Sequence, residues 1–506
     1  MVIYKMDNTP LHKITVGSYF LVIDQIITFG LGFVFWFILA KLVAPETVGQ
    51  VMYVTAAATA VLGFTGYGSQ IATSKYIAEY NAKGMPNVSK KIFSMGLKIG
   101  LLVSAGAAMI FFLLSLTFGH SFYHENSLIP LIIVAMVIFL PLQTILACIN
   151  GAFQGMQKMK YTALADFVFQ VSKLLISIVL IILGFGSFGI IWALALGSLI
   201  TVSVGLKFVR DLFLNNPLTK KEDLPNLRHV IRFSALNYLS IGIGVLSLQI
   251  CYMLLGSQHG FSSVAAFGIS ALISTIVSGV TTSVGRAILP TTSENNDGRN
   301  EQHLSIAVNY AFRLSIVLSG FIYIVFLIAP AQVLSLLSEE YAVASQLLVI
   351  LVLAAIAYSL TTFINFMLNG MGKPKWAANI IIISSLVEIG LAFLLVPYFG
   401  MLGASIVLLV GALASDILAI YYVRKLETVT LSYFNVFMPL VTVGSAISIG
   451  YAALALSSNN TYFALLISMA SYPFLIKTFK VASRTELWQL LQAVFTIIKI
   501  SFGRSG

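Results

Sequence analysis

Charged residues are scarce in this sequence, and their scarcity excludes an ordinary soluble fold. Only 9% of the 506 residues are Asp, Glu, Lys or Arg, whereas 58% are hydrophobic. Soluble proteins carry roughly a quarter charged residues, because water has to be satisfied over the whole surface. Several apolar runs, such as residues 17–40 and 305–329, exceed the ~20 residues that a helix needs to cross a bilayer. The composition therefore predicts an all-α, polytopic membrane protein.

Cysteine is also nearly absent. Cys148 and Cys251 are the two cysteines of the chain, and both fall inside predicted membrane spans, so no disulfide framework or zinc cluster is available. The sequence has no Walker loop, no dinucleotide fingerprint and no nucleophile elbow. We therefore expect no metal, no cofactor, no ATP hydrolysis within this chain and no enzyme activity.

The apolar runs predict about fourteen membrane-spanning helices. Their expected ranges are 17–40, 47–71, 93–118, 128–150, 162–184, 189–209, 233–256, 263–290, 305–329, 343–369, 377–398, 401–423, 433–455 and 461–479. Basic residues gather in alternate connections, for example at Lys90, Lys158 and Lys373, whereas the intervening connections hold only Lys41. Positive residues stay in the cytosol during insertion. We therefore expect a cell-membrane protein with both termini in the cytoplasm, and we attribute the net charge of +11 to topology and not to nucleic-acid binding.

The two halves of the chain repeat one another. Residues 149–160 read INGAFQGMQKMK and residues 364–375 read INFMLNGMGKPK, with six identities at a constant offset of 215. After a one-residue shift, further glycines match, among them Gly186 with Gly400 and Gly197 with Gly411. Each half holds six spans, an even number, so the two repeats are parallel. Their pseudo-twofold axis is expected along the membrane normal.

This repeat predicts the domain organisation. The expected parts are an N-terminal lobe (1–212), a cytoplasmic linker (213–232), a C-terminal lobe (233–425), two extra spans (426–480) and an amphipathic cytoplasmic tail (481–506). A partly ordered segment is the alternative for the tail. Two six-helix lobes that face one another suggest a central cavity and alternating access.

These features resemble the multidrug/oligosaccharidyl-lipid/polysaccharide exporter superfamily. The repeat, the six-plus-six-plus-two spans and the Asn-Gly or Gln-Gly-Met-x-Lys connections carry the resemblance, which covers nearly the whole chain. The chain is most similar to the polysaccharide transporter branch, the O-antigen and teichoic-acid type flippases, since multidrug exporters of the superfamily usually stop at twelve spans. The resemblance implies a flippase of polyprenyl-linked oligosaccharide. Its implied partners are that substrate, membrane lipids, a coupling proton or sodium ion, and glycan-assembly proteins.

A charged side chain near the bilayer centre costs at least ~2.5 kcal/mol, so each one is a candidate functional residue. Lys173 lies in the middle of the fifth span, on a polar stripe that also carries Asp166 and Gln170. In one interpretation, the stripe is the wall of an aqueous cavity, where Lys173 and Gln170 bind the substrate and its phosphate. In the other, Lys173 forms an ion pair that fixes helix packing within one lobe.

Three acidic residues are candidates for cation coupling. Glu388 lies in the middle of the eleventh span, at the repeat position of Lys173, while Asp24 lies in the first span and Asp416 in the twelfth. Each is interpreted either as a proton or sodium site or as a structural partner, and Asp24 is also a candidate for binding sugar hydroxyls. A direct pair between Lys173 and Glu388 is a further alternative.

Hydroxyl residues recur every four positions in the eighth span, which ends near an arginine: Ser270, Ser274, Ser278, Thr282 and Arg286. Ser274 and Ser278 are candidates for hydrogen bonds to sugars, and Arg286 for a phosphate contact near the cytoplasmic mouth. Small hydroxyl residues also pack helices in membranes, and Arg286 fits equally well as an ordinary topology charge.

Two other functions compete with the flippase. A cation-coupled multidrug antiporter of the same superfamily is expected to have an acidic cavity, and Lys173 and Arg286 count against it. A glycan polymerase or ligase is expected to carry its catalytic residues on a large outer loop, and the predicted outer connections are short.

Overall fold

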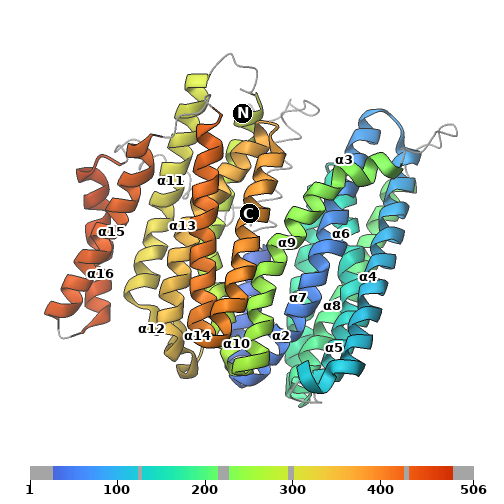
Figure 1. The fold of residues 1–506 in the computed structure, drawn as a ribbon, viewed down its shortest axis with the longest axis horizontal. Helices are drawn as coiled ribbons and strands as arrows, with labels where there is room; N and C mark the ends of the chain where they lie inside the picture. The colour runs from blue at the N-terminus through green and yellow to red at the C-terminus, as the bar shows by residue number, and fades with distance from the viewer. Residues whose placement is uncertain are drawn as a thin grey trace, which may run out of the picture.

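The computed structural model describes residues 27–122, 128–214, 227–294, 301–426, 432–457 and 459–481. All regular secondary structure within these ranges is helical (Figure 1). Eleven helices in this part of the chain are long and apolar enough to cross a membrane. The predicted all-α membrane fold is confirmed.

The first half of the chain begins with the helix Ile27–Leu42. The elements that follow are α2 (Pro45–Leu62), the π-helical segment η1 (Gly63–Tyr67), α3 (Gly68–Ala82), α4 (Pro86–Phe122), α5 (Leu128–Ile133), the π-helical segment η2 (Val134–Phe139), α6 (Leu140–Gly155), α7 (Met159–Ile182) and α8 (Gly186–Leu214). The first three of these form one continuous helix, as do α5, η2 and α6.

The second half begins with α9 (Leu227–His259). It continues with α10 (Phe261–Glu294), α11 (Glu301–Ile328), α12 (Pro330–Ser335), the 3-10 segment η3 (Glu339–Ala344), α13 (Ser345–Gly370) and α14 (Pro374–Arg424). The last two helices are α15 (Tyr433–Leu456) and α16 (Thr461–Thr478).

The number of helical spans is consistent with the fourteen expected. The 51 residues of α14 are far more than one crossing needs, and at Gly400 the backbone leaves helical geometry with a φ of 53°. Two spans therefore lie within α14. The eleven helices counted above include α14 once and do not include Ile27–Leu42 or α16. Counting α14 as two spans and adding these two helices gives fourteen spans in the described part of the chain. The second span is longer than expected, Pro45–Ala82 instead of 47–71, because the helix continues as α3 into more polar sequence.

The helix connections gather at two opposite ends of the molecule. The turns around Gly84, Gln157 and Gly372 lie at one end, here called the Lys158 end. The turns around Gly260 and Gly400 lie at the other end, here called the His259 end. By the distribution of Lys and Arg, the Lys158 end is the expected cytoplasmic side.

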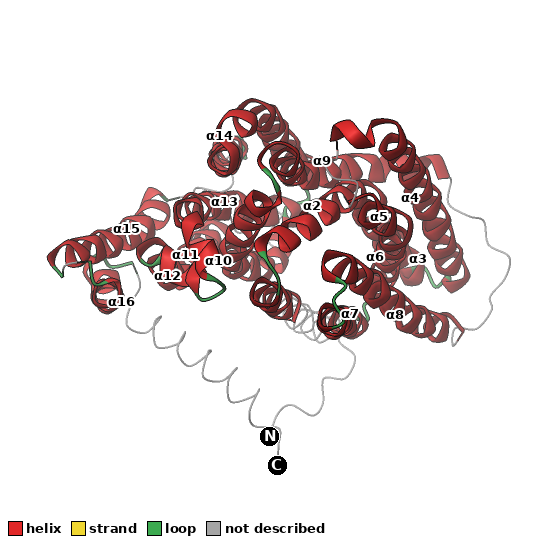
Figure 2. Ribbon diagram, turned by 90° about the horizontal axis from the view of Figure 1, so that it is seen from below, coloured by secondary structure: helices red, strands yellow, loops and turns green. Residues whose placement is uncertain are grey.

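Helices close in sequence pack together within each half. In the first half α7 packs along α8, and α3 packs against α4 and α6. In the second half α13 packs against α10 and α14. The last two helices, α15 and α16, pack on each other and against α11, at one edge of the molecule (Figures 1 and 2). The division into lobes at 1–212 and 233–425 stays a prediction, and residues 482–506, nearly all of the predicted tail, lie outside the described residues.

Backbone geometry follows the sequence repeat. After α6, the Lys158 N–H donates to the Phe153 carbonyl at 2.8 Å, and after α13 the Lys373 N–H donates to the Leu368 carbonyl at 2.9 Å. The residue before each lysine has a positive φ, 56° at Gln157 and 70° at Gly372. These are the hydrogen bonds and left-handed residue of a Schellman C-cap. The two turns that carry the INGAFQGMQKMK repeat thus have the same local structure.

Candidate functional site

Lys173 lies deep in the first half of the molecule, with 7% of its surface exposed. Its Nζ is 4.5 Å from the centroid of the Phe35 ring, on the helix Ile27–Leu42, and 5.0 Å from that of Phe169. On the opposite side Gly197 of α8 leaves room for the α7 backbone, because a Cβ there would lie 3.1 Å from Lys173 N. Two aromatic faces compensate only part of the hydration that a buried ammonium loses.

No anionic partner of Lys173 is present among the described residues. The ion pair within one lobe, weighed as an alternative from the sequence, is therefore not formed in this part of the chain. The direct pair with Glu388 is not formed either. A buried cation without an anionic partner is destabilising, so Lys173 stays a candidate functional residue.

The other polar residues of the predicted stripe also point into the bundle. Thr162, Gln170 and Ser177 are 2%, 6% and 0% exposed, and one oxygen of each has no hydrogen-bond partner within the described ranges. Gln170 Nε2 donates to the Thr28 carbonyl of the helix Ile27–Leu42 at 3.4 Å. Buried polar atoms are normally paired, so this face of α7 has spare hydrogen-bonding capacity.

The stripe is covered rather than open in this conformation. The helix Ile27–Leu42 lies against it through the contacts of Phe35 and Thr28, and α8 packs along the other side of α7. Both helices therefore cover the Lys173 side chain in this conformation.

Asn150 and Asp166 form a second polar contact near the Lys158 end. Asn150 Nδ2 donates to Asp166 Oδ1 at 3.4 Å, and Asn150 Oδ1 is buried with no hydrogen-bond partner among the described residues. Tyr67 of η1 lies within electrostatic range of Asp166 and is 39% exposed, although it sits in the middle of its span. The sequence placed Asp166 on the stripe, but only the fold brings Asn150 and Tyr67 to it.

Glu388 occupies the matching place in the second half, with 8% of its surface exposed. A Cβ at Gly411, on the next span, would collide with its carboxyl group, just as Gly197 is the close neighbour of Lys173. Ser247 of α9 lies beside the carboxyl. No basic partner of Glu388 occurs in the described part of the chain. Burying a carboxylate without a basic partner is costly, so Glu388 stays a candidate functional residue.

Asp416 is tied to α13 by two hydrogen bonds. Its Oδ1 accepts from the backbone N–H of Thr361 at 3.1 Å and from Thr361 Oγ1 at 2.7 Å. Tyr358, one turn before Thr361, is 42% exposed and lies within electrostatic range of both Asp416 and Glu388. We call Glu388, Asp416 and Tyr358 the carboxyl cluster.

The hydroxyl ladder of α10 is bonded to its own helix. Ser274 Oγ donates to the Ala271 carbonyl at 2.7 Å, and Thr282 Oγ1 donates to the Ser278 carbonyl at 2.7 Å. Such bonds satisfy the hydroxyl donors locally, which favours the packing interpretation of this ladder. Arg286 lies in α10, but its side chain lies outside the described part of the structure, and Asp24 precedes the described residues.

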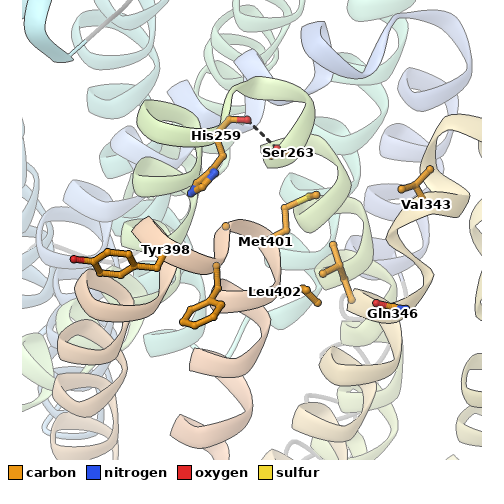
Figure 3. A pocket seen from close by; sticks show the side chains of 10 residues that line it. His259, Ser263, Val343, Gln346, Tyr398, Met401 and Leu402 are labelled. Atoms are coloured by element: carbon orange, nitrogen blue, oxygen red, sulfur yellow. Dashed lines mark hydrogen bonds between the residues drawn. The ribbon is translucent and has the colours of Figure 1, made fainter.

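A cavity of about 430 Å³ lies at the His259 end of the second half (Figure 3). His259, Ser263, Gln346 and the bend of α14 line it. His259 Nε2 donates to the Val396 carbonyl at 2.9 Å, in the turn before the bend at Gly400, so the ring ties α9 to α14. None of the site residues expected from the sequence lines this cavity.

The structure brings the expected site residues together in two groups. Lys173 and Gln170 lie on one face of α7, and Glu388 and Asp416 both lie within electrostatic range of Tyr358. Sequence reasoning missed Tyr358, Thr361 and Phe35 as their neighbours. No local signal marks these three, because each reaches its partner from another helix. No group of three or more His, Cys, Asp and Glu suited to a metal ion is found in the described ranges.

Comparison with known families gives two matches. The model described as Polysaccharide biosynthesis protein matches residues 14–296, and the MatE model matches residues 240–394. Stage V sporulation protein B of Bacillus subtilis is 26% identical over 93% of this chain and 96% of its own length. A putative O-antigen transporter of Shigella dysenteriae is 22% identical over 76% of this chain and 92% of its own. A probable low-salt glycan biosynthesis flippase, Agl15 of Haloferax volcanii, is 20% identical over 50% of this chain and 52% of its own length.

Solved transporters share the fold. The inward-facing conformation of a multidrug resistance MATE family transporter of the MOP superfamily superimposes with a TM-score of 0.62 at 18% identity, over 79% of this chain and 94% of that one. A eukaryotic MATE transporter superimposes with a TM-score of 0.61 at 15% identity, over 82% and 95%. The superfamily expected from the repeat and the span count is confirmed. Because the first family model matches more than half of its residues, the chain belongs to the polysaccharide biosynthesis protein family.

Proposed function

We propose that this protein is a flippase that moves polyprenyl-linked oligosaccharide from the cytoplasmic to the outer leaflet by alternating access. The observation that carries the proposal is the family membership, together with relatives whose names are O-antigen transporter and glycan biosynthesis flippase. The spans beyond the twelfth, α15 and α16, agree with this branch and set the chain apart from twelve-span drug exporters.

Lys173 supplies the chemistry for the phosphate of the lipid carrier. The ammonium is buried against two aromatic rings and has no anion among the described residues. A phosphate or pyrophosphate provides the missing negative charge, and charge-assisted hydrogen bonds of this kind are about twice as strong as neutral ones. Gln170, one turn away, offers its amide oxygen, which has no hydrogen-bond partner in the described part of the chain, to hydroxyl donors of the sugar.

The remaining candidates belong to the same proposal as secondary contacts. We assign substrate binding to Asp24, Ser274, Ser278 and Arg286. The hydrogen bonds that α10 hydroxyls donate within their own helix make the two serines weaker candidates. We place the Lys158 end in the cytoplasm, with both termini on that side, and we include glycan-assembly proteins among the partners.

We assign cation coupling to the carboxyl cluster, with Asp24 as a further candidate. Glu388 and Asp416 come from two spans of α14 and have no basic partner within the described residues. Taking up a proton or sodium ion neutralises these buried carboxyls, and releasing it charges them again. Such a change alters the packing of α14 against α9 and α13, which are its neighbours in the second half.

The test is translocation of a labelled polyprenyl-pyrophosphate oligosaccharide in proteoliposomes. Wild type is compared with Lys173→Ala and with Lys83→Ala, whose lysine lies at the Lys158 end and is half exposed in an ion pair with Glu79. Transport by wild type and Lys83→Ala, with loss in a correctly folded Lys173→Ala, supports the flippase and the role of Lys173.

A second candidate is a cation-coupled multidrug antiporter. The MatE match over residues 240–394 and the MATE fold favour it as a member of the same superfamily. If the proteoliposomes carry cationic dyes against a proton or sodium gradient and do not move the labelled lipid, drug antiport replaces the flippase assignment.

A further inference from the structure

Two spans of this protein divide their packing between the two halves of the molecule. The α2 segment packs mainly against α9 and α10, whereas its continuation α3 packs mainly against α6 and α4. Conversely, α9 packs along α14 but also reaches α3 and η1. Figure 1 shows α9 running obliquely from the α10 side at the His259 end to the α3 side at the other end. The two spans therefore cross one another inside the membrane.

Near the His259 end, the two halves pack tightly at three glycines. A Cβ at Gly49, Gly256 or Gly268 would collide with an atom across the interface, and the partners are Phe261, Tyr53 and Met52 respectively. The Tyr53 and Phe261 rings also meet edge to face, with centroids 5.5 Å apart. Small residues allow helix backbones in membranes to approach this closely. We call these contacts the closed gate.

The crossing itself lies at η1, in the middle of the second span. A Cβ at Gly63 would lie 3.3 Å from Gly242 Cα and 3.2 Å from Val245 Cβ, and a Cβ at Gly242 would collide with the Phe64 ring. Glycine on both helices lets the two backbones touch where they cross. At that point the Phe64 ring packs over Gly242 and the Val245 side chain packs over Gly63, so each helix offers the other a glycine as its contact surface.

The π-helical geometry of η1 adds local compliance at the same place. Its five residues, GFTGY, interrupt the α-helical hydrogen bonding between α2 and α3. Single π-helical turns within α-helices are rare, are frequent at functional sites and cause helix bends. A bend at η1 allows α2 and α3 to change their mutual angle while each keeps its neighbours.

From this arrangement we propose that the contact of Gly63 with Gly242 and Val245 is the fulcrum about which the two halves rock, with η1 as the hinge. Rocking about a point in the middle of the membrane separates the helices at the closed gate and brings them together at the Lys158 end. The distance at the fulcrum itself stays nearly constant. The inference concerns the motion and does not depend on the identity of the cargo.

Two cysteine pairs between the same two spans test the proposal, in a background with Cys148→Ala and Cys251→Ala. The gate pair is Tyr53→Cys with Gly256→Cys, and the fulcrum pair is Gly63→Cys with Val245→Cys. A Cβ at residue 63 would be 3.2 Å from Val245 Cβ, close to the roughly 3.5–4.5 Å of a disulfide. Fluorophores clicked onto azide-bearing residues at Leu183 and Val343, both exposed at the His259 end, report the separation of the two halves by single-molecule energy transfer.

We expect two exchanging transfer efficiencies before oxidation and a single one after the gate pair is oxidised, with exchange restored by reductant. After oxidation of the fulcrum pair both states persist, and their population ratio changes by less than about tenfold. The proposal is overturned if the fulcrum disulfide stops exchange as completely as the gate disulfide. It is also overturned if the unlocked protein shows one state only, or if exchange continues with the gate locked.

A second variant guards against a crosslink that distorts η1. Gly242→Val places a side chain against Phe64 and is expected to slow exchange at least tenfold, while the matched change Gly444→Val, at a glycine with no neighbour within 4 Å of an added Cβ, leaves the rate unchanged. Equal rates in both variants contradict the fulcrum. If exchange behaves as expected but the protein does not transport lipid-linked oligosaccharide, the flippase proposal is refuted and the fulcrum proposal stands.

Discussion

Replacing Lys173 by methionine is expected to make the protein more stable and less active at the same time. Methionine keeps the length of the side chain and its packing on Phe35 and Phe169, but it removes the ammonium. Replacing a buried ion pair by apolar residues of similar volume is often neutral or stabilising by about 1–4 kcal/mol, and an unpaired charge also lacks the attraction that offsets its desolvation. Each of the two cation–π interactions that the ammonium makes contributes about 0.5–2 kcal/mol in the opposite direction. No anionic partner among the described residues offsets the desolvation of the ammonium, which costs several kcal/mol for a buried ion, so we expect a net gain in the free energy of unfolding.

The cost of this substitution appears in transport. A hydrogen bond to a charged group contributes about 1.5–3 kcal/mol, which corresponds to a loss of roughly 10- to 150-fold in a rate that depends on that hydrogen bond. We therefore expect the initial rate of translocation of labelled polyprenyl-pyrophosphate oligosaccharide to fall by this factor at substrate concentrations below saturation. Gain of stability with loss of activity is typical of a functional site.

The assays are thermal unfolding in detergent, followed by intrinsic fluorescence, and translocation in proteoliposomes. Lys83→Met is the matched control, because Lys83 is half exposed in a surface ion pair with Glu79, and pairs of this kind contribute about 0–1 kcal/mol. If Lys173→Met is less stable than wild type, the lysine has a structural partner outside the described residues and the reasoning is wrong. Unchanged transport refutes the contact with the substrate phosphate.

Three further predictions follow from single contacts. Glu388→Gln should remove the dependence of transport on a proton or sodium gradient while leaving gradient-independent exchange of lipid measurable in proteoliposomes; unchanged gradient dependence contradicts coupling at this residue. Gln157→Gly should raise the free energy of unfolding by about 1 kcal/mol, because the φ of 56° at this residue suits glycine. Gly372→Ala, at the matching turn, should lower it by a similar amount. Chemical denaturation measures both changes, and a shift of the same sign and size in the two variants refutes this reasoning. His259→Leu should lower the melting temperature, because the Val396 carbonyl loses its hydrogen-bond donor and an unsatisfied buried acceptor costs about 1–3 kcal/mol of stability. His259→Gln, which retains a donor, should recover part of the loss in melting temperature.

The membrane fold follows from local properties of the chain. The length and apolarity of each run decide whether it spans the bilayer, and both are visible in sequence. The repeat also predicted local structure, since the turns at Lys158 and Lys373 have the same hydrogen bonds. Gly400 carried a visible signal as well, because the positive φ that separates the two spans of α14 falls on a glycine of the repeat.

The candidate site was predictable only in part. Lys173, Glu388 and Asp416 stand out because charge is expensive in hydrocarbon wherever it occurs. Their neighbours Tyr358 and Thr361 carry no such signal, since hydroxyl groups are common in spans and pack helices. The π-helical geometry of η1 was not predictable from periodicity, because five residues are too few to show it.

The sequence alone determined the spans, the repeat and the identity of the buried charges, because these depend on hydrophobicity and spacing along one chain. Tertiary structure decided what those charges meet. The repeat predicts a pseudo-twofold relation between the halves, which places residues at the same repeat position on opposite sides of the axis unless they lie at it. For this reason Lys173 and Glu388 match in sequence without forming an ion pair, and each is instead enclosed by helices of its own half.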